Sequence, residues 1–242
     1  MSMPQTTIGS RLVFQNAVAS IRRAGLNPAG AVLSQSYLRL ETALVASQTQ
    51  YNFDVLVNES TNGTFNTQQK LNLQDAFVAS SIGFYFAVPI GSATNAEYKL
   101  LSYPTIGLEF GGGSGGNFTA ATAEDALAFY NGYWSLTINQ RVIVPNWDLA
   151  RHLVIPPVQN NGVVAMTAGA ATAPVAPLHY TGDAYDGGEI AQYPVEPNIT
   201  FVGSKKHQFQ ITLPVGIATI PSNARVVALM RGVLAQNVTS VN

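Results

Sequence analysis

Apolar and polar residues alternate in several stretches of this chain, and this feature restricts its possible folds more than any other. The stretch His207–Leu213 alternates without interruption, and Trp134–Val144 alternates with one exception, at Gln140. Successive side chains of a β-strand point to opposite faces of the sheet, whereas a helix repeats about every 3.6 residues. Alternation therefore predicts strands with one face on a core and the other facing water or a neighbouring molecule.

The alternating stretches also predict which side chains form the core. Three further stretches, 38–44, 53–57 and 81–88, alternate in the same way. Their predicted inward residues are Leu38, Leu40, Leu44, Phe53, Val55, Val57, Ile82, Phe84, Phe86 and Val88. Those of the first two stretches are Trp134, Leu136, Ile138, Val142, Val144, Phe209, Ile211 and Leu213. We expect the inward residues of 134–138 and 209–213 to share one core.

Weaker strand patterns raise the expected number of strands to about nine to eleven. They cover residues 97–103, 105–110, 163–166, 199–202 and 225–234. Many short strands separated by glycine and proline are typical of an all-β protein, either a β-sandwich or a jelly roll. A single jelly roll and a compact double jelly roll both fit this pattern.

One long helix is predicted, and it lies near the N-terminus. Ser10 can act as its N-cap, and Gly25 provides a C-terminal stop. Between them Val13, Ala17 and Ile21 recur every four residues as an apolar stripe. Shorter helical patterns occur later in the chain, at residues 122–130 and 146–152.

The length of 242 residues suits one large β domain or two small ones. We expect an N-terminal helical arm in residues 1–34 and a β-sandwich body with long loops in residues 35–242. The body could consist of two halves divided near residues 111–121, where glycine is abundant.

Charged residues are few and strongly segregated along the chain. They make up 10% of the sequence, and every acidic residue lies between Glu41 and Glu196. The two ends, 1–40 and 197–242, each carry four basic residues and no acid. The surface of a soluble monomer is usually rich in charge of both signs, so we expect this chain to cover much of its surface with copies of itself. Basic ends and an acidic middle would suit head-to-tail contacts, although chance segregation is an alternative.

The predicted helix is basic because it contains Arg11, Arg22 and Arg23. Such a helix could dock on a neighbouring subunit or pack on its own sheet. It could also contact a membrane surface or nucleic acid, because both attract cationic side chains. The sequence leaves these alternatives open.

The chain contains no cysteine, which excludes a disulfide framework and a Cys-based zinc site. Its first residues lack the basic and apolar regions of a signal peptide. It also lacks an uninterrupted apolar stretch of about 18 residues, the length of a membrane-spanning helix. We expect a protein made in the cytoplasm of a host cell.

No arrangement of residues indicates catalysis. Ser114 lies in a run of glycines that matches both a nucleophile-elbow and a dinucleotide-binding pattern, but such a run matches most glycine patterns. A triad of Ser114, His179 and Asp183 can be written, yet nothing in the sequence brings these residues together. The other histidines, His152 and His207, show no metal-ligand spacing. We expect no active site, no cofactor and no small-molecule substrate.

One acidic cluster is a candidate metal site. Asp183, Asp186 and Glu189 lie within seven residues of a glycine-rich turn, and carboxylate oxygens on a loop suit Ca²⁺. The spacing differs from that of an EF-hand, so a solvated acidic turn is the alternative. The cluster belongs to a long Ala- and Pro-rich stretch, 158–197, which we expect to be a loop that reaches a neighbouring subunit.

Several segments resemble those of bacteriophage virion proteins. They are Tyr133–Asn139, Val144–Trp147, Phe209–Pro214 and Val226–Leu234. The resemblance is to jelly-roll major capsid proteins, including those of lipid-containing phages. It implies a capsid subunit that assembles into trimers or larger capsomers, has other virion proteins as partners and resides in the virion.

Two other classes of function stay open at this point. One is a carbohydrate-binding or adhesion module with an aromatic platform made by Tyr130, Tyr133, Trp134 and Trp147. The other is a serine hydrolase that uses Ser114. The carbohydrate-binding module would differ from a capsid subunit in its oligomeric state, because a lectin-like module need not assemble.

Overall fold

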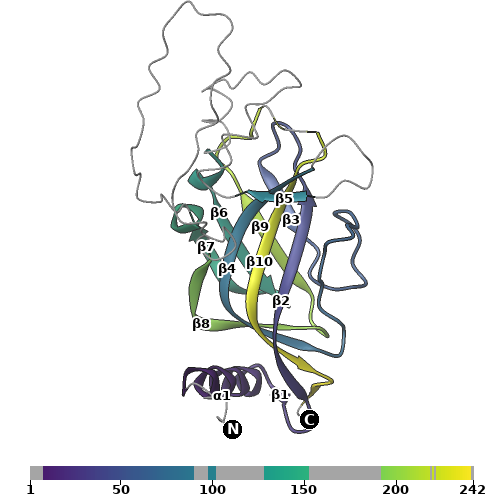
Figure 1. Cartoon of the computed structure of the whole chain (residues 1–242), viewed down its shortest axis with the longest axis vertical. Coiled ribbons are helices and arrows are strands. Elements are labelled where there is room, and N and C mark those ends of the chain that lie inside the picture. The colour runs from purple at the N-terminus through teal and green to yellow at the C-terminus, as the bar shows by residue number, and fades with distance from the viewer. Residues whose placement is uncertain are drawn as a thin grey trace, which may run out of the picture.

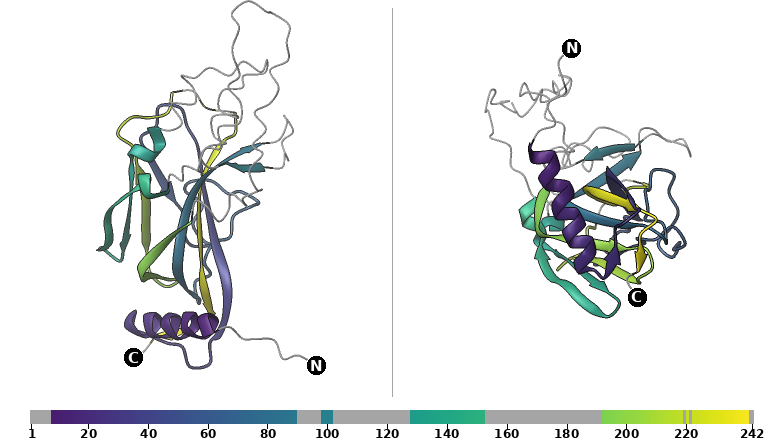
Figure 2. Two further views of the ribbon diagram at one scale, coloured as in Figure 1. Left: turned by 60° about the vertical axis from the view of Figure 1, so that its left-hand side comes forward. Right: turned by 90° about the horizontal axis from the view of Figure 1, so that it is seen from below.

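The chain folds as an all-β sandwich, as the alternation predicts. The computed structural model describes residues 8–89, 98–101, 128–152, 192–218, 220 and 222–240. Two antiparallel sheets pack face to face, and a helix crosses one end of them (Figure 1). Figure 2 shows the two layers from the side and the helix from below.

The strands are β1 (Leu26–Asn27), β2 (Val32–Ala43), β3 (Gln50–Phe53), β4 (Ala76–Pro89), β5 (Tyr98–Leu101), β6 (Tyr133–Ile138), β7 (Arg141–Asp148), β8 (Tyr193–Val202), β9 (His207–Thr212), β10 (Arg225–Gln236) and β11 (Thr239–Ser240). The helical elements are α1 (Ile8–Arg23) and two 3-10 turns, η1 (Ala128–Asn131) and η2 (Leu149–His152).

One sheet has five strands and the other has four. The five-stranded sheet runs β2-β10-β4-β5, and β8 also pairs with β4. The four-stranded sheet runs β3-β9-β6-β7, while β1 and β11 form a separate pair. Strands that follow one another along the chain therefore cross repeatedly from one sheet to the other.

The core lies between the two sheets and includes most of the residues that alternation predicts, together with others that it did not predict, such as Phe77 and Phe129. The inward residues of 134–138 and 209–213 share one buried cluster with Leu38, Leu40, Leu44, Ile82, Phe84 and Phe86. The ring of Trp134 lies edge-on to that of Phe209, with centroids 5.6 Å apart. Because side chains of both sheets contribute, this packing stabilises the sandwich as a unit.

The stretch Trp134–Val144 is a hairpin and not one strand, which corrects the prediction. Asn139 and Gln140 form its turn, both with positive φ (45° and 65°). Asn139 donates its backbone N–H to the Lys206 carbonyl and accepts the Lys206 N–H on Oδ1. The ladder between β6 and β7 shifts register between Leu136 and Thr137. Val142 therefore lies opposite the outward Thr137 and is 58% exposed, although we predicted it to be inward.

The stretch 53–57 also departs from its predicted pattern, because β3 ends before Asp54. The buried Asp54 carboxylate accepts hydrogen bonds from the backbone and side-chain amides of Asn62 and lies 3.7 Å from the Lys70 ammonium. This network turns the chain into a loop. Val57 is exposed in that loop, so its predicted inward position is wrong.

Helix α1 packs on the sheets of its own chain. Ala17 and Ile21 are buried in a second apolar cluster, which residues of β4, β8 and β10 complete. Val13, the third member of the predicted stripe, is 39% exposed. The helix stops where predicted, since Gly25 has a φ of +80°, which favours glycine. Among the described residues, no helix is long and apolar enough to span a membrane.

The other predicted elements have mixed outcomes. The strands expected at 97–103, 199–202 and 225–234 correspond to β5, the end of β8 and β10. The helix expected at 146–152 is wrong in its first part, which belongs to β7, and η2 forms the remainder. Residues 193–197, expected in a long loop, begin β8. The predictions at 105–110, 111–121 and 163–166, and those for residues 122–127, lie outside the described residues.

Candidate interaction surface

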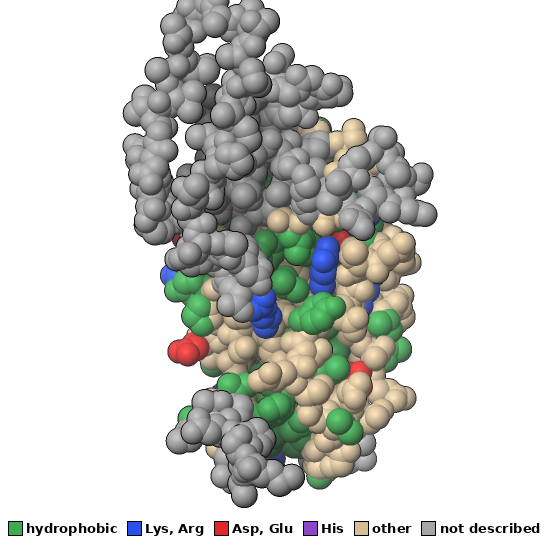
Figure 3. Space-filling view, viewed as in Figure 1, with side chains coloured by type: hydrophobic (Ala, Val, Ile, Leu, Met, Phe, Trp, Pro, Cys, Tyr) green, Lys and Arg blue, Asp and Glu red, His purple; other side chains and the backbone are tan. Residues whose placement is uncertain are grey.

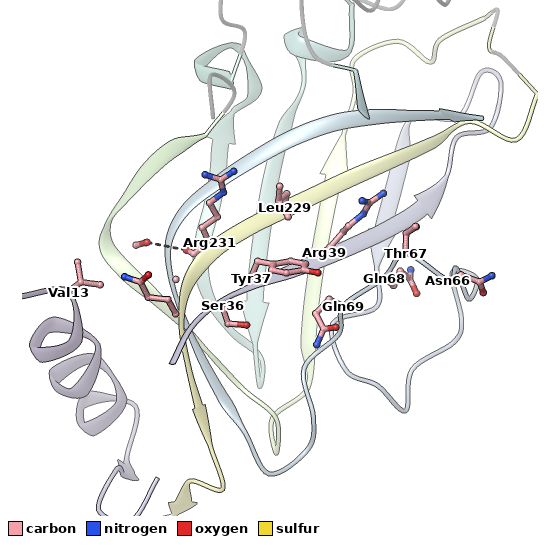
Figure 4. A pocket seen from close by; sticks show the side chains of 13 residues that line it. Val13, Ser36, Tyr37, Arg39, Asn66, Thr67, Gln68, Gln69, Leu229 and Arg231 are labelled. Carbon is pink, nitrogen blue, oxygen red and sulfur yellow. Dashed lines mark hydrogen bonds between the residues drawn. The ribbon is translucent and has the colours of Figure 1, made fainter. Parts of the chain in front are cut away.

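The outer face of the five-stranded sheet, which points away from the core, carries a groove. The groove has a volume of about 920 Å³ and lies between α1 and the loop at residues 66–69. Figure 3 shows basic and apolar side chains together on this face, and Figure 4 shows the groove from close by. Its lining residues are Val13, Gln35, Ser36, Tyr37, Arg39, Asn66, Thr67, Gln68, Gln69, Ser80, Leu229, Arg231 and Gly232.

Two neighbouring strands supply the groove floor. Tyr37 and Arg39 of β2 lie opposite Arg231 and Leu229 of β10 in the antiparallel register. All four point outward because the alternate residues of both strands, such as Leu38, enter the core. Tyr37 is 50% exposed and lies in the middle of the groove (Figure 4).

A β-bulge shapes the floor beside Arg231. The register between β4 and β10 shifts at Arg231 and Gly232, and this leaves Ser80 without an opposite residue. The Ser80 hydroxyl donates to the Arg231 carbonyl at 3.1 Å. A Cβ atom on Gly232 would lie 1.9 Å from the Val78 carbonyl oxygen, so this position requires glycine. Bulges of this kind redirect side chains at functional surfaces.

A buried carboxylate organises one end of the groove. The side chain of Glu41 is fully buried and accepts hydrogen bonds from Arg39 Nε at 2.6 Å and Arg225 at 2.9 Å. It also accepts the hydroxyl of Thr67 at 2.5 Å, while the Gln68 side chain donates to the Glu41 carbonyl at 2.8 Å. Charge-assisted hydrogen bonds such as these hold the loop at 66–69 against the sheet.

Arg225 joins this network to two aromatic rings. Its guanidinium carbon lies 4.2 Å from the ring centroid of Phe65 and 3.7 Å from that of Tyr98. Cation–π contacts of this kind add to the ion pair with Glu41. The sequence did not predict this network, although one signal was present: Arg39 and Glu41 are two residues apart and therefore share a strand face.

The charges of the chain are divided unevenly between described and other residues. All 12 lysines and arginines belong to the described residues, but only six of the 13 acids do: Glu41, Asp54, Glu59, Asp75, Asp148 and Glu196. Arg39 comes from the basic N-terminal block and Arg225 from the basic C-terminal block, and both pair with Glu41 of the same chain. Among the described residues that line the groove, two are arginines and none is acidic.

Two of the three histidines are described, and both are buried. Val202 donates its N–H to Nε2 of His207 at 3.3 Å. Burial, reinforced by the positive charge of Lys205, lowers the pKa of His207 to about 4. The ring of His152 packs edge-on against Phe84 at 4.9 Å. The residues written as a catalytic triad, Ser114, His179 and Asp183, lie outside the described residues.

The four aromatic residues proposed as a carbohydrate platform do not lie on one surface. Tyr130 and Trp134 are buried in the core, which corrects that prediction. Trp147 is partly buried against Trp134, and the Arg151 guanidinium lies 5.3 Å from its ring centroid. Tyr133 alone of the four is exposed.

The predicted calcium ligands Asp183, Asp186 and Glu189 also lie outside the described residues. Within the described part of the chain, no group of three or more His, Asp or Glu side chains is arranged to hold a metal ion.

Comparison with known proteins adds no relative to these observations. No protein-family model, no curated protein and no solved structure matches this chain significantly.

Proposed function

We propose that this protein is a structural subunit that assembles with copies of itself into the shell of a bacteriophage virion. The observation that carries the proposal is the strand order. With β5 set aside, the sheets read β2-β10-β4-β8 and β3-β9-β6-β7. This order supports a single jelly roll, a fold of eight strands in two sheets that occurs in viral capsid and lectin domains.

Features of the protein surface also support the proposal that the chain assembles with copies of itself. Large apolar side chains are exposed at several separate places, among them Val45, Val142, Ile143 and Val215. Single exposed apolar residues are normal, but these occur on a chain with few charges. Symmetric shells bury such residues in many repeated contacts, and other virion proteins could cover the remainder.

Two of these exposed residues lie on adjoining loops at one end of the sandwich. The Ser47 N–H donates to the Ile217 carbonyl at 2.8 Å, which ties the loop after β2 to the loop after β9. Val45 and Val215 are each two residues away from this hydrogen bond and are exposed, so we treat them as one apolar patch. A second patch, Val142 and Ile143, lies on the edge strand β7.

The proposal is tested by negative-stain electron microscopy of the purified protein and of two variants. We expect shells or capsomers from the native chain. One variant carries Val45→Ser with Val215→Ser, and the other carries Val142→Ser with Ile143→Ser. At least one should lose assembly while its melting temperature stays close to native, because these side chains contribute little to the core.

The matched control is Gln208→Ser, which changes an exposed polar residue of β9. It should assemble like the native chain. A protein that forms no particle, with folding intact, would contradict the proposal.

A further inference from the structure

Strand β2 forms one edge of the five-stranded sheet, and part of this edge has open backbone hydrogen-bonding groups. On the side away from β10, Arg39 exchanges backbone hydrogen bonds with Gln69 at 3.0 and 2.9 Å. In an antiparallel ladder the backbone groups of every second residue point the same way, and the ladder between β2 and β10 is uninterrupted. The backbone groups of Leu33, Gln35 and Tyr37 therefore point away from β10, and no described residue pairs with them there.

The segment Val32–Leu38, which we call the free edge, lacks the usual protection against strand addition. Sheet edges are commonly protected by short strands, prolines or charged residues. The other edge strands have such features: β3 and β5 have four residues each, and β7 and β8 contain Pro145, Pro194 and Pro197. The free edge contains neither proline nor charge. It is therefore a template on which another strand can pair.

The groove provides space beside the free edge. Its lining includes Gln35, Ser36 and Tyr37 of β2, together with the loop at residues 66–69 (Figure 4). Two apolar or aromatic side chains of the free edge are also open to solvent, since Val32 is 60% exposed and Tyr37 is 50% exposed. A strand that pairs here would cover both.

The sequence of the free edge is complementary to itself. It has two apolar residues, then three polar residues, then a tyrosine and a leucine. If two copies pair antiparallel about a two-fold axis at Gln35, apolar or aromatic residues face each other and so do polar ones. The opposite residues are then Leu33 with Tyr37, Ser34 with Ser36, and Val32 with Leu38.

The chain on either side of the free edge fits this pairing. Gln69 already occupies the partner position of Arg39. In the two-fold arrangement, the residue of the second copy that falls opposite Arg39 is Ala31, which precedes β2. Ala31 donates its N–H to the Pro28 carbonyl at 3.1 Å, within a turn. The two copies can therefore pair over the whole free edge without competing with Gln69 for the backbone of Arg39.

We propose that the free edge pairs antiparallel with the free edge of a second copy of this chain. Leu33, Gln35 and Tyr37 each exchange both backbone hydrogen bonds with the opposite residue. A surface that pairs with itself in this way gives a closed two-fold contact. The proposal rests on the proposed function for the presence of neighbouring copies, and it identifies one contact between them.

Disulfide formation tests both the pairing and its register, because the chain contains no cysteine. One chain carries Ser34→Cys, and a co-expressed, tagged chain carries Ser36→Cys. Opposite residues of this kind have Cα atoms about 4.5 Å apart, whereas position 34 of one copy lies diagonally, about 7–8 Å, from position 34 of the other. Because a disulfide does not bridge more than about 7 Å, the mixture should form about tenfold more linked dimer than either variant alone.

A charge placed at the two-fold axis identifies the contact. Gln35→Lys, added to both chains, puts like charges opposite each other and should remove most of the linked dimer. Gln208→Lys, at an exposed position of β9, is the matched control and should leave the yield unchanged. Thermal melting checks the folding of each variant, and Gln35→Glu replaces Gln35→Lys if that variant does not fold.

A linked dimer that needs both cysteine substitutions and is lost with Gln35→Lys supports the proposal. Equal yields from the mixture and the single variants, a yield that ignores Gln35→Lys, or no dimer at all would overturn it. Electron microscopy of the same samples separates this contact from the proposed shell. Particles without the linked dimer would contradict the edge pairing alone, whereas the linked dimer without particles would contradict the shell alone.

Discussion

Glu41 is a buried charge whose partners come from distant parts of the chain. Arg39 lies on the same strand, but Thr67 and Arg225 belong to a loop and to the penultimate strand. If a buried charge is removed from such a network, its partners are left without a compensating ion. This loss destabilises the fold by more than the intact ion pair stabilises it.

We therefore predict that Glu41→Gln lowers the free energy of unfolding by about 2–4 kcal/mol. Urea unfolding measures this change. Glu196→Gln, which alters an exposed acid of β8, is the control and should change stability by at most about 0.5 kcal/mol. Equal effects of the two substitutions would mean that the network around Glu41 does not hold the loop at 66–69.

His207 makes stability depend on pH in a predictable direction. Its pKa is about 4 in the fold and near 6.5 in the unfolded chain. As the pH falls below 6.5, the unfolded chain binds a proton first, so the free energy of unfolding decreases until about pH 4. Protonation also removes the acceptor that the Val202 N–H uses.

The expected loss from His207 between pH 7 and pH 5 is about 2 kcal/mol. His207→Gln retains an acceptor for the Val202 N–H but does not titrate, so this part of the pH dependence should disappear. Denaturant unfolding of both proteins at several pH values measures the difference. Parallel pH profiles would show that the His207 proton is not linked to folding.

At the scale of elements, the hairpin of β6 and β7 illustrates what sequence reasoning can and cannot reach. The inward residues of β6 and β9 were predictable because burial of one strand face is encoded locally, by alternation. The turn was missed because Asn139–Gln140 lacks the glycine that usually signals a two-residue hairpin. Its geometry depends on contacts with Lys206, which no local pattern contains.

The turn also provides a stability test. Gln140 has a φ of 65°, a conformation that costs most residues about 1–2 kcal/mol but suits glycine. Gln140→Gly should raise the free energy of unfolding by about 0.5–1 kcal/mol after the greater flexibility of unfolded glycine is counted. Gln208→Gly, in the extended strand β9, should lower it by a similar amount. Calorimetric melting measures both variants. If both substitutions lower the free energy of unfolding, the turn geometry is contradicted.

The candidate groove was harder to predict than the core. Alternation places Arg39 on an outward face, but the opposite residues Leu229 and Arg231 follow from strand pairing across nearly 200 positions. The bulge at Ser80 and Gly232 depends on the same pairing. The pairing register of strands that are far apart along the chain is difficult to predict from a single sequence. The buried face of each strand is easier to predict, because apolar residues alternate along it.

At the scale of the whole molecule, the amino-acid composition and the fold both favour contacts between copies of the chain. The described body carries twice as many basic as acidic residues, and apolar side chains are exposed on both β7 and the end loops. A sandwich with these surfaces is suited to repeated contacts between copies.

The measurement that tests this account most directly is the mass of the protein in solution. Multi-angle light scattering over a dilution series should give stable species of three or more chains, each of 25.7 kDa. Their mass should fall for a variant whose apolar patches are replaced by serine. A single species of 25.7 kDa at every concentration, with the fold intact, would contradict assembly as the function of this protein.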